Sequence, residues 1–447
     1  MINNSQYDIM PVIYFDNFRG FTDTFLPLKN TNFFVGENST GKTSVLKLIK
    51  IVSDPRFWLM QDFNSEEAEL GYFSEILSSN AQKKKYFEIG LLGDSKDKEA
   101  NISAIKMKFF EKEGQPELRE ICLIDKTINF QAVIDDYGFK YRHSFIDLDN
   151  ITESNKLKYF RRWVKSNGLQ NKVYTKVNIE GSFFRQAFLL QIDTIISREI
   201  RRDDKKNEIK GFKIPSFLRD IAWLAPIRTE PKRTYDNYKI NFNPDGTHAP
   251  YMLKKLLTSK RSSKKPNEVE GILKKFGQDS GLFEEIKITN LGKSDTSPFE
   301  IHIVINGNSL KITNVGYGVS QILPLIVEVI ARPKKSWFAI QQPEIHLHPK
   351  GQAAFGDFML KSFLREEKNF IVETHSDYTI DRYRLKMNKN FKEKNENPES
   401  QIVFFNRSLE GNKLTCIEIK DDGTLSEDQP KEFREFFIKE QFDLLKV

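Results

Sequence analysis

Apolar residues near the start of the chain first form short runs and then recur at helical spacing. Short runs within residues 11–31 and the run at residues 33–35 predict strands. After a polar, glycine-bounded stretch, four apolar residues follow at spacings i, i+3, i+4 and i+7, which predicts a helix with one buried face. These four residues are Val45, Leu48, Ile49 and Val52. The pattern therefore predicts a strand, a glycine-bounded loop and a helix in succession.

The middle of the chain contains a linker-like stretch, then a strand pattern and then a helical pattern. Residues 54–79 have the composition of a linker. Four segments with strand character and turn residues between them then predict an antiparallel sheet. These segments are residues 86–92, 102–110, 117–124 and 128–134. From about residue 151 to 215 the pattern becomes helical and charged, and residues 183–200 form its best helix, so we interpret this stretch as a helical insertion.

Strands and helices alternate from residue 266 to 447, which predicts a parallel sheet. Before them, a hydrophobic strand runs into a loop that carries Arg228 and Arg233, which either bind an anion or pair with surface acids. The predicted fold class is α/β, with a mixed or parallel sheet core, an antiparallel β-layer and a helical insertion. The predicted segments are an N-terminal lobe (1–150), the insertion (151–215) and a C-terminal lobe (216–447).

Composition narrows the class of protein. No apolar run approaches the ~18–20 residues of a membrane span, so we expect no membrane partner. The two cysteines, Cys122 and Cys416, are far apart and predict neither a disulfide framework nor a cysteine zinc site. These features predict a cytoplasmic protein.

The net charge of +7 is concentrated in two basic clusters. The first cluster consists of Lys254, Lys255, Lys260, Arg261, Lys264 and Lys265, and the second of Lys156, Lys158, Arg161, Arg162 and Lys165. Such clusters can follow the phosphates of DNA. For either cluster alone, a solvated surface is the more common explanation.

The loop before the first helix has the pattern G-x-x-x-x-G-K-T, which is a nucleotide-binding P-loop. Its predicted binding residues are Gly36, Glu37, Asn38, Ser39, Thr40, Gly41, Lys42, Thr43 and Ser44. The two glycines let backbone N–H groups and the helix N-terminus point at phosphates. We expect Lys42 to reach the β- and γ-phosphates of ATP and the Thr43 hydroxyl to bind Mg²⁺.

Three later stretches combine strand ends or helix starts with polar residues. The first, residues 314–321, places Gly318 and Ser320 at the start of a long helix, where an anion can bind. The second ends a buried strand with Gln341 and Gln342 and continues into a proline turn. The third is a buried strand that ends in the sequence Glu-Thr-His-Ser, at residues 373–376.

Together with the P-loop, the order of these stretches resembles the ATP-binding-cassette (ABC) type of ATPase, and more narrowly the prokaryotic AAA ATPases related to the OLD, RecF and SMC families. The resemblance covers residues 11–55 and 216–447. It implies a P-loop NTPase fold with an ABC-type head. It also implies that Gly318 and Ser320 form a signature loop, which contacts the ATP of a second subunit, and that His375 is the switch histidine. The expected partner is therefore a second copy of the chain, in a homodimer or a larger oligomer.

The chain departs from the resembling group at the catalytic acids. Relatives commonly carry Glu-Glu-Pro-Glu, where the first acid supports Mg²⁺ and the second orients water; here Gln341 and Gln342 stand at these positions. An amide cannot act as a base, and loss of a general base costs about 10²–10⁴ in rate. Glu344 or Glu373 can compensate, and we favour Glu373. The candidate catalytic residues are therefore Gln342, Glu344, Glu373 and His375.

The biological function is predicted from the resembling group and not from individual residues. Members of the resembling group occur in antiphage defence with a separate nuclease of HNH or Toprim type. We therefore expect an ATPase that controls such a DNA-acting partner. A RecF-like DNA-repair ATPase and a non-hydrolysing, ATP-sensing scaffold remain alternatives. His346 and His348 lack a well-placed third metal ligand, and we expect them to shape the turn and the subunit interface.

Overall fold

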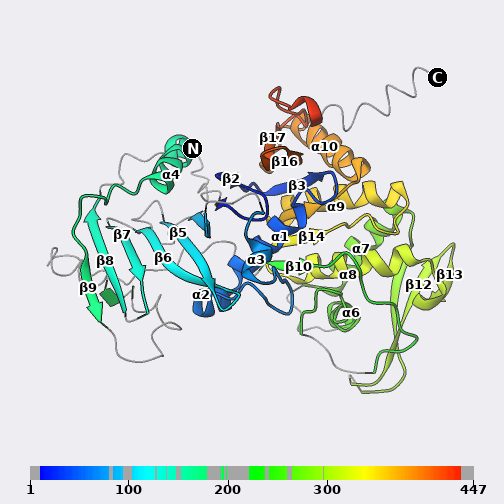
Figure 1. Ribbon diagram of the computed structural model, residues 1–447. Helices are drawn as coiled ribbons and strands as arrows, with labels where there is room; N and C mark the ends of the chain where they lie inside the picture. The colour runs from blue at the N-terminus through cyan, green and yellow to red at the C-terminus, as the bar shows by residue number, and fades with distance from the viewer. Residues whose placement is uncertain are drawn as a thin grey trace. The chain divides into compact units, whose positions relative to one another are not determined.

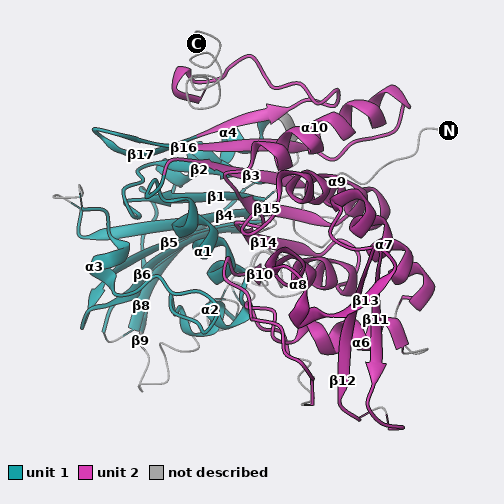
Figure 2. Cartoon of the chain, turned by 90° about the vertical axis from the view of Figure 1, so that its right-hand side faces the viewer, with its two compact units in different colours: residues 1–28, 38–220, 406–414 teal, residues 29–37, 221–405, 415–447 magenta. Residues whose placement is uncertain are grey.

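The structure is a computed structural model of the chain. It describes residues 11–79, 84–93, 103–125, 128–136, 138–146, 153–178, 192, 194–195, 198, 221–236, 241–258, 264–294 and 296–433. The chain forms two compact units, coloured separately in Figure 2. The first unit consists of residues 1–28, 38–220 and 406–414, and the second of residues 29–37, 221–405 and 415–447. The three-part division expected from the sequence stays a prediction.

The first unit is built on an antiparallel sheet of eight strands in the order β2-β1-β4-β5-β6-β7-β8-β9. Its strands are β1 (Val12–Asp16), β2 (Thr24–Pro27), β4 (Tyr86–Gly93), β5 (Ser103–Lys112), β6 (Gln115–Asp125), β7 (Ile128–Ile134), β8 (Gly138–Phe145) and β9 (Thr175–Asn178) (Figure 1). The predicted antiparallel sheet is confirmed, and its four predicted segments are β4 to β7. The strands β8 and β9 extend it beyond the prediction.

Side chains on the two faces of this sheet pack against different helices. One face carries a cluster of edge-packed and stacked rings formed by Phe63, Phe87 and Phe109. Against the other face, Phe160 and Trp163 of α4 (Glu153–Lys165) pack with sheet residues such as Cys122. The helix α4 lies in the predicted helical insertion, but β9 shows that the insertion is not wholly helical. The predicted helix at 183–200 lies almost wholly outside the described residues.

Three helices follow the P-loop or the linker in the first unit: α1 (Lys42–Ser53), α2 (Pro55–Met60) and α3 (Phe73–Ile76). The four apolar residues that predicted α1 are all fully buried. The short helices α2 and α3 stand where the sequence had predicted only a linker. Asp54 caps α2, since its side chain accepts the N–H of Arg56, and Pro55 starts the helix.

The second unit is built on a six-stranded sheet in the order β10-β14-β15-β3-β16-β17. Its strands are β3 (Thr31–Gly36), β10 (Ala222–Leu224), β14 (Trp337–Gln341), β15 (Asn369–Glu373), β16 (Ser400–Ser408) and β17 (Gly411–Ile419). The end of β16 and the start of β17, within residues 406–414, belong to the first unit. The pairs β10–β14, β14–β15, β15–β3 and β3–β16 are parallel, which confirms the predicted parallel sheet. Their carboxyl ends therefore meet at one edge of the sheet.

Five described helices and a small sheet complete the second unit. The helices are α6 (Ala249–Thr258), α7 (Pro266–Ser280), α8 (Tyr317–Ala331), α9 (Pro349–Glu366) and α10 (Asp377–Lys392). The small sheet is antiparallel and consists of β11 (Glu285–Asn290), β12 (Phe299–Ile305) and β13 (Asn308–Lys311). In Figure 2, the helices α8, α9 and α10 lie beside the strands β3, β15 and β14. The fold is α/β with mixed sheets, as the sequence predicted.

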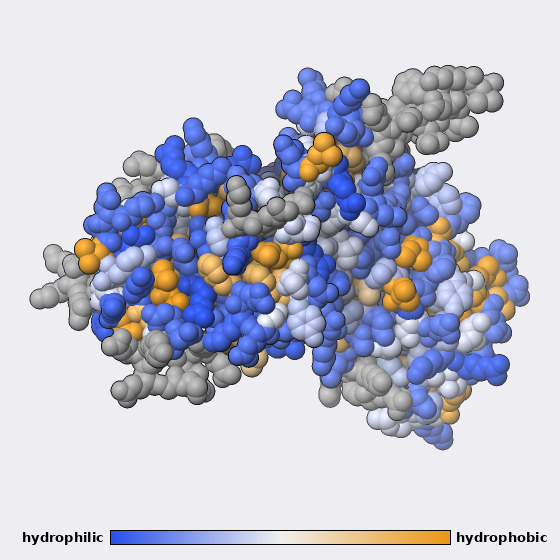
Figure 3. Space-filling view, in the orientation of Figure 1, coloured by the Kyte–Doolittle hydropathy of each residue, from blue (hydrophilic) through white to orange (hydrophobic). Residues whose placement is uncertain are grey.

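The surface is mainly hydrophilic on the face drawn in Figure 3, where hydrophobic residues form small separate patches. Among the helices that the structure describes, none has the length and apolar character needed to cross a membrane.

Candidate nucleotide site

The P-loop begins where β3 ends, at Gly36. This glycine has a φ of +138°, and a Cβ at this position would overlap the carbonyl oxygen of Phe405 in the neighbouring strand β16. Both constraints require glycine. The chain can therefore leave the sheet edge in a tight turn, which is the local geometry that a phosphate cradle needs.

The second half of the P-loop belongs to the first unit and opens α1. Gly41 has a φ of +92° and is the N-cap residue, and a Cβ there would lie 2.5 Å from the ring of Phe21. Ser39 is also left-handed, with a φ of +60°, and its carbonyl oxygen accepts an N–H of Arg407 at 2.6 Å. The loop residues fit a polyphosphate because the backbone, and not bulky side chains, forms the turn before the helix N-terminus.

The P-loop side chains differ in exposure. Lys42 and Thr40 are buried, Thr43 and Ser44 are half-buried, and Glu37, Asn38 and Ser39 are exposed. The hydroxyl of Ser44 accepts an N–H of Arg19 at 3.2 Å. Lys42 and Thr43 lie in the first turn of α1, and their roles toward phosphate and Mg²⁺ stay predictions.

In the second unit, three strand ends lie next to one another. Gln341, the last residue of β14, is in register with Glu373, the last residue of β15, and Glu373 is in register with Phe34 of β3. Two strand spacings, about 10 Å, thus separate Gln341 from Phe34, which lies two residues before the end of β3 at Gly36. We call this the strand-end edge. The expectation that the Gln341 and Glu373 strands are neighbours is confirmed.

Gln342 leaves the strand-end edge in a strained conformation. Its φ is +45°, and its backbone N–H donates to the carbonyl oxygen of Glu373 at 2.8 Å. A left-handed residue other than glycine costs about 1–3 kcal/mol and persists only where its surroundings hold it. The hydrogen bond to Glu373 in β15 keeps the backbone of Gln342 in this conformation. The side chain of Gln342 is half-buried beside the strand-end edge.

The two candidate substitute acids have different surroundings. Glu344 accepts the hydroxyl of Thr374 at 2.8 Å and the backbone N–H of His375 at 2.7 Å, one with each carboxylate oxygen. Glu373 ends a strand and is 4% exposed. The contacts of Glu344 are those of a brace between the turn after β14 and the end of β15. This arrangement favours Glu373 as the base, and that assignment remains a prediction.

The helix α8 contains both predicted signature residues. A Cβ on Gly318 would lie 3.0 Å from the carbonyl oxygen of His346. Ser320 is 6% exposed, and its hydroxyl donates to the carbonyl oxygen of Tyr317 at 2.8 Å. The exposed start of the helix is instead formed by Gly316 and Tyr317. The structure therefore places the Ser320 hydroxyl inside its own unit, and the predicted contact of Gly318 and Ser320 with a second subunit stays a prediction.

Sequence reasoning did not include Arg228, Gln321 and Thr374 in the site. The sequence predicted that Arg228 either binds an anion or pairs with surface acids, without assigning it to this site; it is 4% exposed and its Nη2 donates to the carbonyl oxygen of Gln341 at 3.3 Å. The side-chain amide of Gln321 pairs with both backbone groups of Arg228, at 3.3 and 3.5 Å. Thr374 was visible as the residue after Glu373, whereas the importance of Gln321 and Arg228 depends on contacts that no local pattern reveals.

The two turn histidines have distinct surroundings. His348 is the N-cap of α9, and its Nδ1 accepts the N–H of Lys350 at 3.3 Å. His346 is exposed and left-handed, with its ring 5.6 Å from that of Tyr317. Within the described residues, no group of three potential metal ligands comes together.

Several residues of the basic clusters make contacts within the chain. Lys254 donates to the carbonyl oxygen of Ser297 and lies over the ring of Phe299. Lys264 pairs with Glu366 at 2.5 Å, and Lys165 pairs with Asp23 at 2.9 Å. Lys260 and Arg261 lie outside the described residues. The first cluster is thus only partly available to a nucleic acid.

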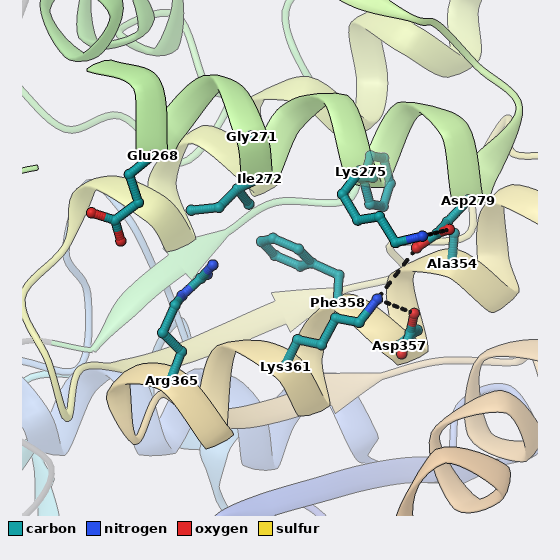
Figure 4. A pocket seen from close by; sticks show the side chains of 11 residues that line it. Glu268, Gly271, Ile272, Lys275, Asp279, Ala354, Asp357, Phe358, Lys361 and Arg365 are labelled. Carbon is teal, nitrogen blue, oxygen red and sulfur yellow. Dashed lines mark hydrogen bonds and ion pairs between the residues drawn. The ribbon is translucent and has the colours of Figure 1, made fainter. Parts of the chain in front are cut away.

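A hollow of about 300 Å³ lies between α7 and α9. Figure 4 shows its apolar floor, with Ile272 and Phe358, and the ion pairs that Lys361 makes with Asp279 and Asp357 at one end. It contains none of the predicted site residues. The predicted site residues lie instead in the P-loop and the first turn of α1, at the strand-end edge and its following turns, and at the start of α8.

Comparison with solved structures gives SMC heads of low identity. The structure described as SmcHead bound to the C-winged helix domain of ScpA is 11% identical, over 92% of this chain and 97% of that chain, with a TM-score of 0.44. The SMC head domain from Thermotoga maritima is 10% identical, over 92% and 99%, with a TM-score of 0.38. A Smc head domain with an extended coiled coil, bound to the C-terminal domain of ScpA and derived from Pyrococcus furiosus, is 11% identical, over 98% and 99%, with a TM-score of 0.37.

No curated protein matches the chain. The family described as AAA ATPase domain matches residues 12–380, which contain the P-loop, the start of α8 and the ends of β14 and β15. The chain therefore belongs to the AAA ATPase domain family.

Proposed function

We propose that the protein binds ATP with Mg²⁺ and hydrolyses it slowly. The observation that carries this proposal is the strand order β14-β15-β3, because it gathers Gln341, Glu373 and the first P-loop glycine at one edge. Bound Mg²⁺ would neutralise phosphate charge. Lys42 would hold the β- and γ-phosphates, and the Thr43 hydroxyl and Gln341 are the side chains that would hold the metal ion.

Slow turnover is proposed because amides replace both acids of the resembling group. The amides of Gln341 and Gln342 donate and accept hydrogen bonds but cannot take a proton from water. The carboxylate of Glu373, at the end of the strand next to Gln341, is then the proposed base. His375 directly follows Thr374 after the same strand and is exposed, and we assign it to the terminal phosphate.

A titration of the protein with a fluorescent ATP analogue, followed by a phosphate-release assay, tests this function. Lys42→Ala should abolish high-affinity binding because it removes the cation that reaches the β- and γ-phosphates. Unchanged affinity in this variant would contradict the P-loop assignment. Wild-type turnover above roughly 1 per second would contradict slow hydrolysis.

We further propose that ATP drives pairing of two copies in the cytoplasm and controls a separate DNA-acting nuclease, of HNH or Toprim type, in antiphage defence. The resemblance of the motifs to this group supports the proposal. Co-expression with the product of the neighbouring open reading frame tests it. Co-purification and ATP-dependent DNA cleavage are expected, whereas stable DNA binding by the purified chain with no co-purifying protein would favour a RecF-like function.

Direct DNA contact is tested by charge reversal in the first basic cluster at Lys255, Lys260 and Arg261. For each phosphate that the variant no longer binds, the log–log salt slope of duplex binding should fall by about 0.9. An unchanged slope would assign this cluster to solvent or to a protein partner. The second candidate function is a non-hydrolysing scaffold, which the pair Gln341 and Gln342 favours, and the absence of phosphate release in the wild type would support it.

A further inference from the structure

Arg228 is a buried cation with unused hydrogen-bonding capacity. Its side chain makes one hydrogen bond, from Nη2 to the carbonyl oxygen of Gln341 at 3.3 Å, while Nε and Nη1 are buried and have no partner among the described residues. A buried polar group without a partner is costly, and a buried charge without one is more so. A side chain in this state is expected where a ligand supplies the missing acceptor.

The charges around Arg228 leave it uncompensated. Glu344 is the carboxylate whose charge acts on it, but the two oxygens of Glu344 already accept hydrogen bonds from Thr374 and His375. Burial lowers the pKa of Arg228 to about 10, and Glu344 opposes this only in part, so the guanidinium is still charged at neutral pH. Acids at positions 341 and 342 would add compensation, and here both residues are amides.

The position of Arg228 points to a phosphate. Its Nη2 donates to the last residue of β14, and two strand spacings, about 10 Å, lie between that residue and Phe34, which precedes the P-loop start at Gly36 by two residues. A triphosphate bound at the P-loop start would extend along the strand-end edge. The planar guanidinium presents two N–H groups to phosphate oxygens at fixed geometry.

We propose that Arg228 binds the terminal phosphate of ATP and so distinguishes ATP from ADP. The proposal rests on the proposed ATP-binding function. The backbone of Arg228 also connects it to α8, the helix that contains Gly318 and Ser320. Both the N–H and the carbonyl group of Arg228 pair with the side-chain amide of Gln321 in this helix. Binding of the terminal phosphate thereby fixes the position of the helix start that faces a second copy of the chain.

The test compares Arg228→Met with Arg228→Lys and with the control Arg233→Met, which changes an exposed arginine of the same loop. Fluorescent analogues of ATP and ADP are titrated with Mg²⁺. Arg228→Met should lower ATP affinity about ten- to hundredfold, the loss expected for charge-assisted hydrogen bonds, and change ADP affinity less than about twofold. The ATP affinity of Arg228→Lys should lie between those of the wild type and Arg228→Met, because lysine keeps the positive charge but lacks the planar guanidinium with its two parallel N–H groups. The control should match the wild type.

Thermal unfolding separates this role from a structural one. Without nucleotide, Arg228→Met should melt at or above the wild-type temperature, because an apolar side chain removes an unpaired buried charge. The proposal is overturned if ATP and ADP affinities fall together, if neither falls, or if both Arg228 variants melt below the wild type with the ATP-to-ADP ratio unchanged. Failure of the wild type itself to bind ATP would instead overturn the proposed function.

Discussion

The carboxylate of Glu344 accepts the backbone N–H of His375 at 2.7 Å, which ties the turn after β14 to the residues that follow β15. The second oxygen of Glu344 accepts the hydroxyl of Thr374 at 2.8 Å. A glutamate that the sequence offered as a base thus connects the turn after β14 to His375, the predicted switch histidine. If Glu344 is a base, Glu344→Gln should affect hydrolysis alone. If Glu344 holds the turn in place, the same substitution should also destabilise the protein.

Glu344→Gln should slow hydrolysis and also destabilise the protein. A glutamine presents N–H groups where the carboxylate accepted, so one of the two donors loses its acceptor, at a cost of about 1–3 kcal/mol. Thermal unfolding and phosphate release are measured together, with the exposed Glu367→Gln as the control. If hydrolysis stops while the melting temperature stays at the wild-type value, Glu344 acts as a base and the brace is not its main role.

Local patterns and distant contacts explain what the sequence could predict. The P-loop and α1 follow from glycine positions and helical spacing within about twenty residues, and the strands β4 to β7 follow from alternation and turn residues. The sheet β11-β12-β13 was missed because its short strands lie inside a region that also contains helices. The surroundings of Arg228 are formed by Gln321 and Gln341, which lie 93 and 113 residues away in the sequence. No local sequence pattern contains these contacts.

Tyr317→Arg should stop ATP-dependent pairing of two copies and leave ATP affinity unchanged. Tyr317 is 51% exposed at the start of α8, so a bulky cation there would meet a second copy without entering the core. Ser320→Arg would place a charge in a buried position and test folding instead. Light scattering with and without ATP is the measurement, and Leu385→Arg on exposed α10 is the control. Normal pairing of the Tyr317 variant would contradict contact through the start of α8.

A buried cluster in the second unit predicts an acid-sensitive contribution to stability. Glu328 accepts Nε2–H of His248 at 2.8 Å and Nε–H of Arg332 at 2.5 Å. The Nδ1 of His248 accepts the N–H of Asn243, so a neutral imidazole satisfies this arrangement. Burial alone would raise the pKa of Glu328, but the hydrogen bond from His248 and the charge of Arg332 lower it below its ordinary 4.5.

Because the folded-state pKa of Glu328 is the lower one, its stabilisation is complete above the ordinary value and is lost as the pH falls through the folded-state value. Glu328→Gln removes the carboxylate partner of Arg332 and should lower the free energy of unfolding by about 3 kcal/mol at pH 7. The difference from wild type should shrink below about pH 4.5. Denaturant unfolding at pH 7 and pH 4 measures both. Glu410→Gln, in an exposed ion pair, is the control, and a difference that does not change with pH would contradict the assignment.

Gln342→Glu tests whether the missing acid limits hydrolysis. Gln342 already has a φ of +45°, and glutamate has the same backbone requirements, so the substitution adds no new backbone strain. If the remaining geometry is intact, the new carboxylate supplies a base, and phosphate release should rise by about tenfold or more. The cost is a second carboxylate near Glu373, whose carbonyl accepts the N–H of residue 342.

The outcome depends on what Glu373 already does. If Glu373 is the base, Gln342→Glu should add little, and Glu373→Gln should reduce hydrolysis about 10²-fold or more while ATP binding persists. Steady-state phosphate release from the wild type, both single variants and the double variant separates the two cases. Recovery of activity in the double variant would show that position 342 can replace Glu373. Turnover that is insensitive to Gln342→Glu, Glu373→Gln and Glu344→Gln alike would contradict a carboxylate base at the strand-end edge.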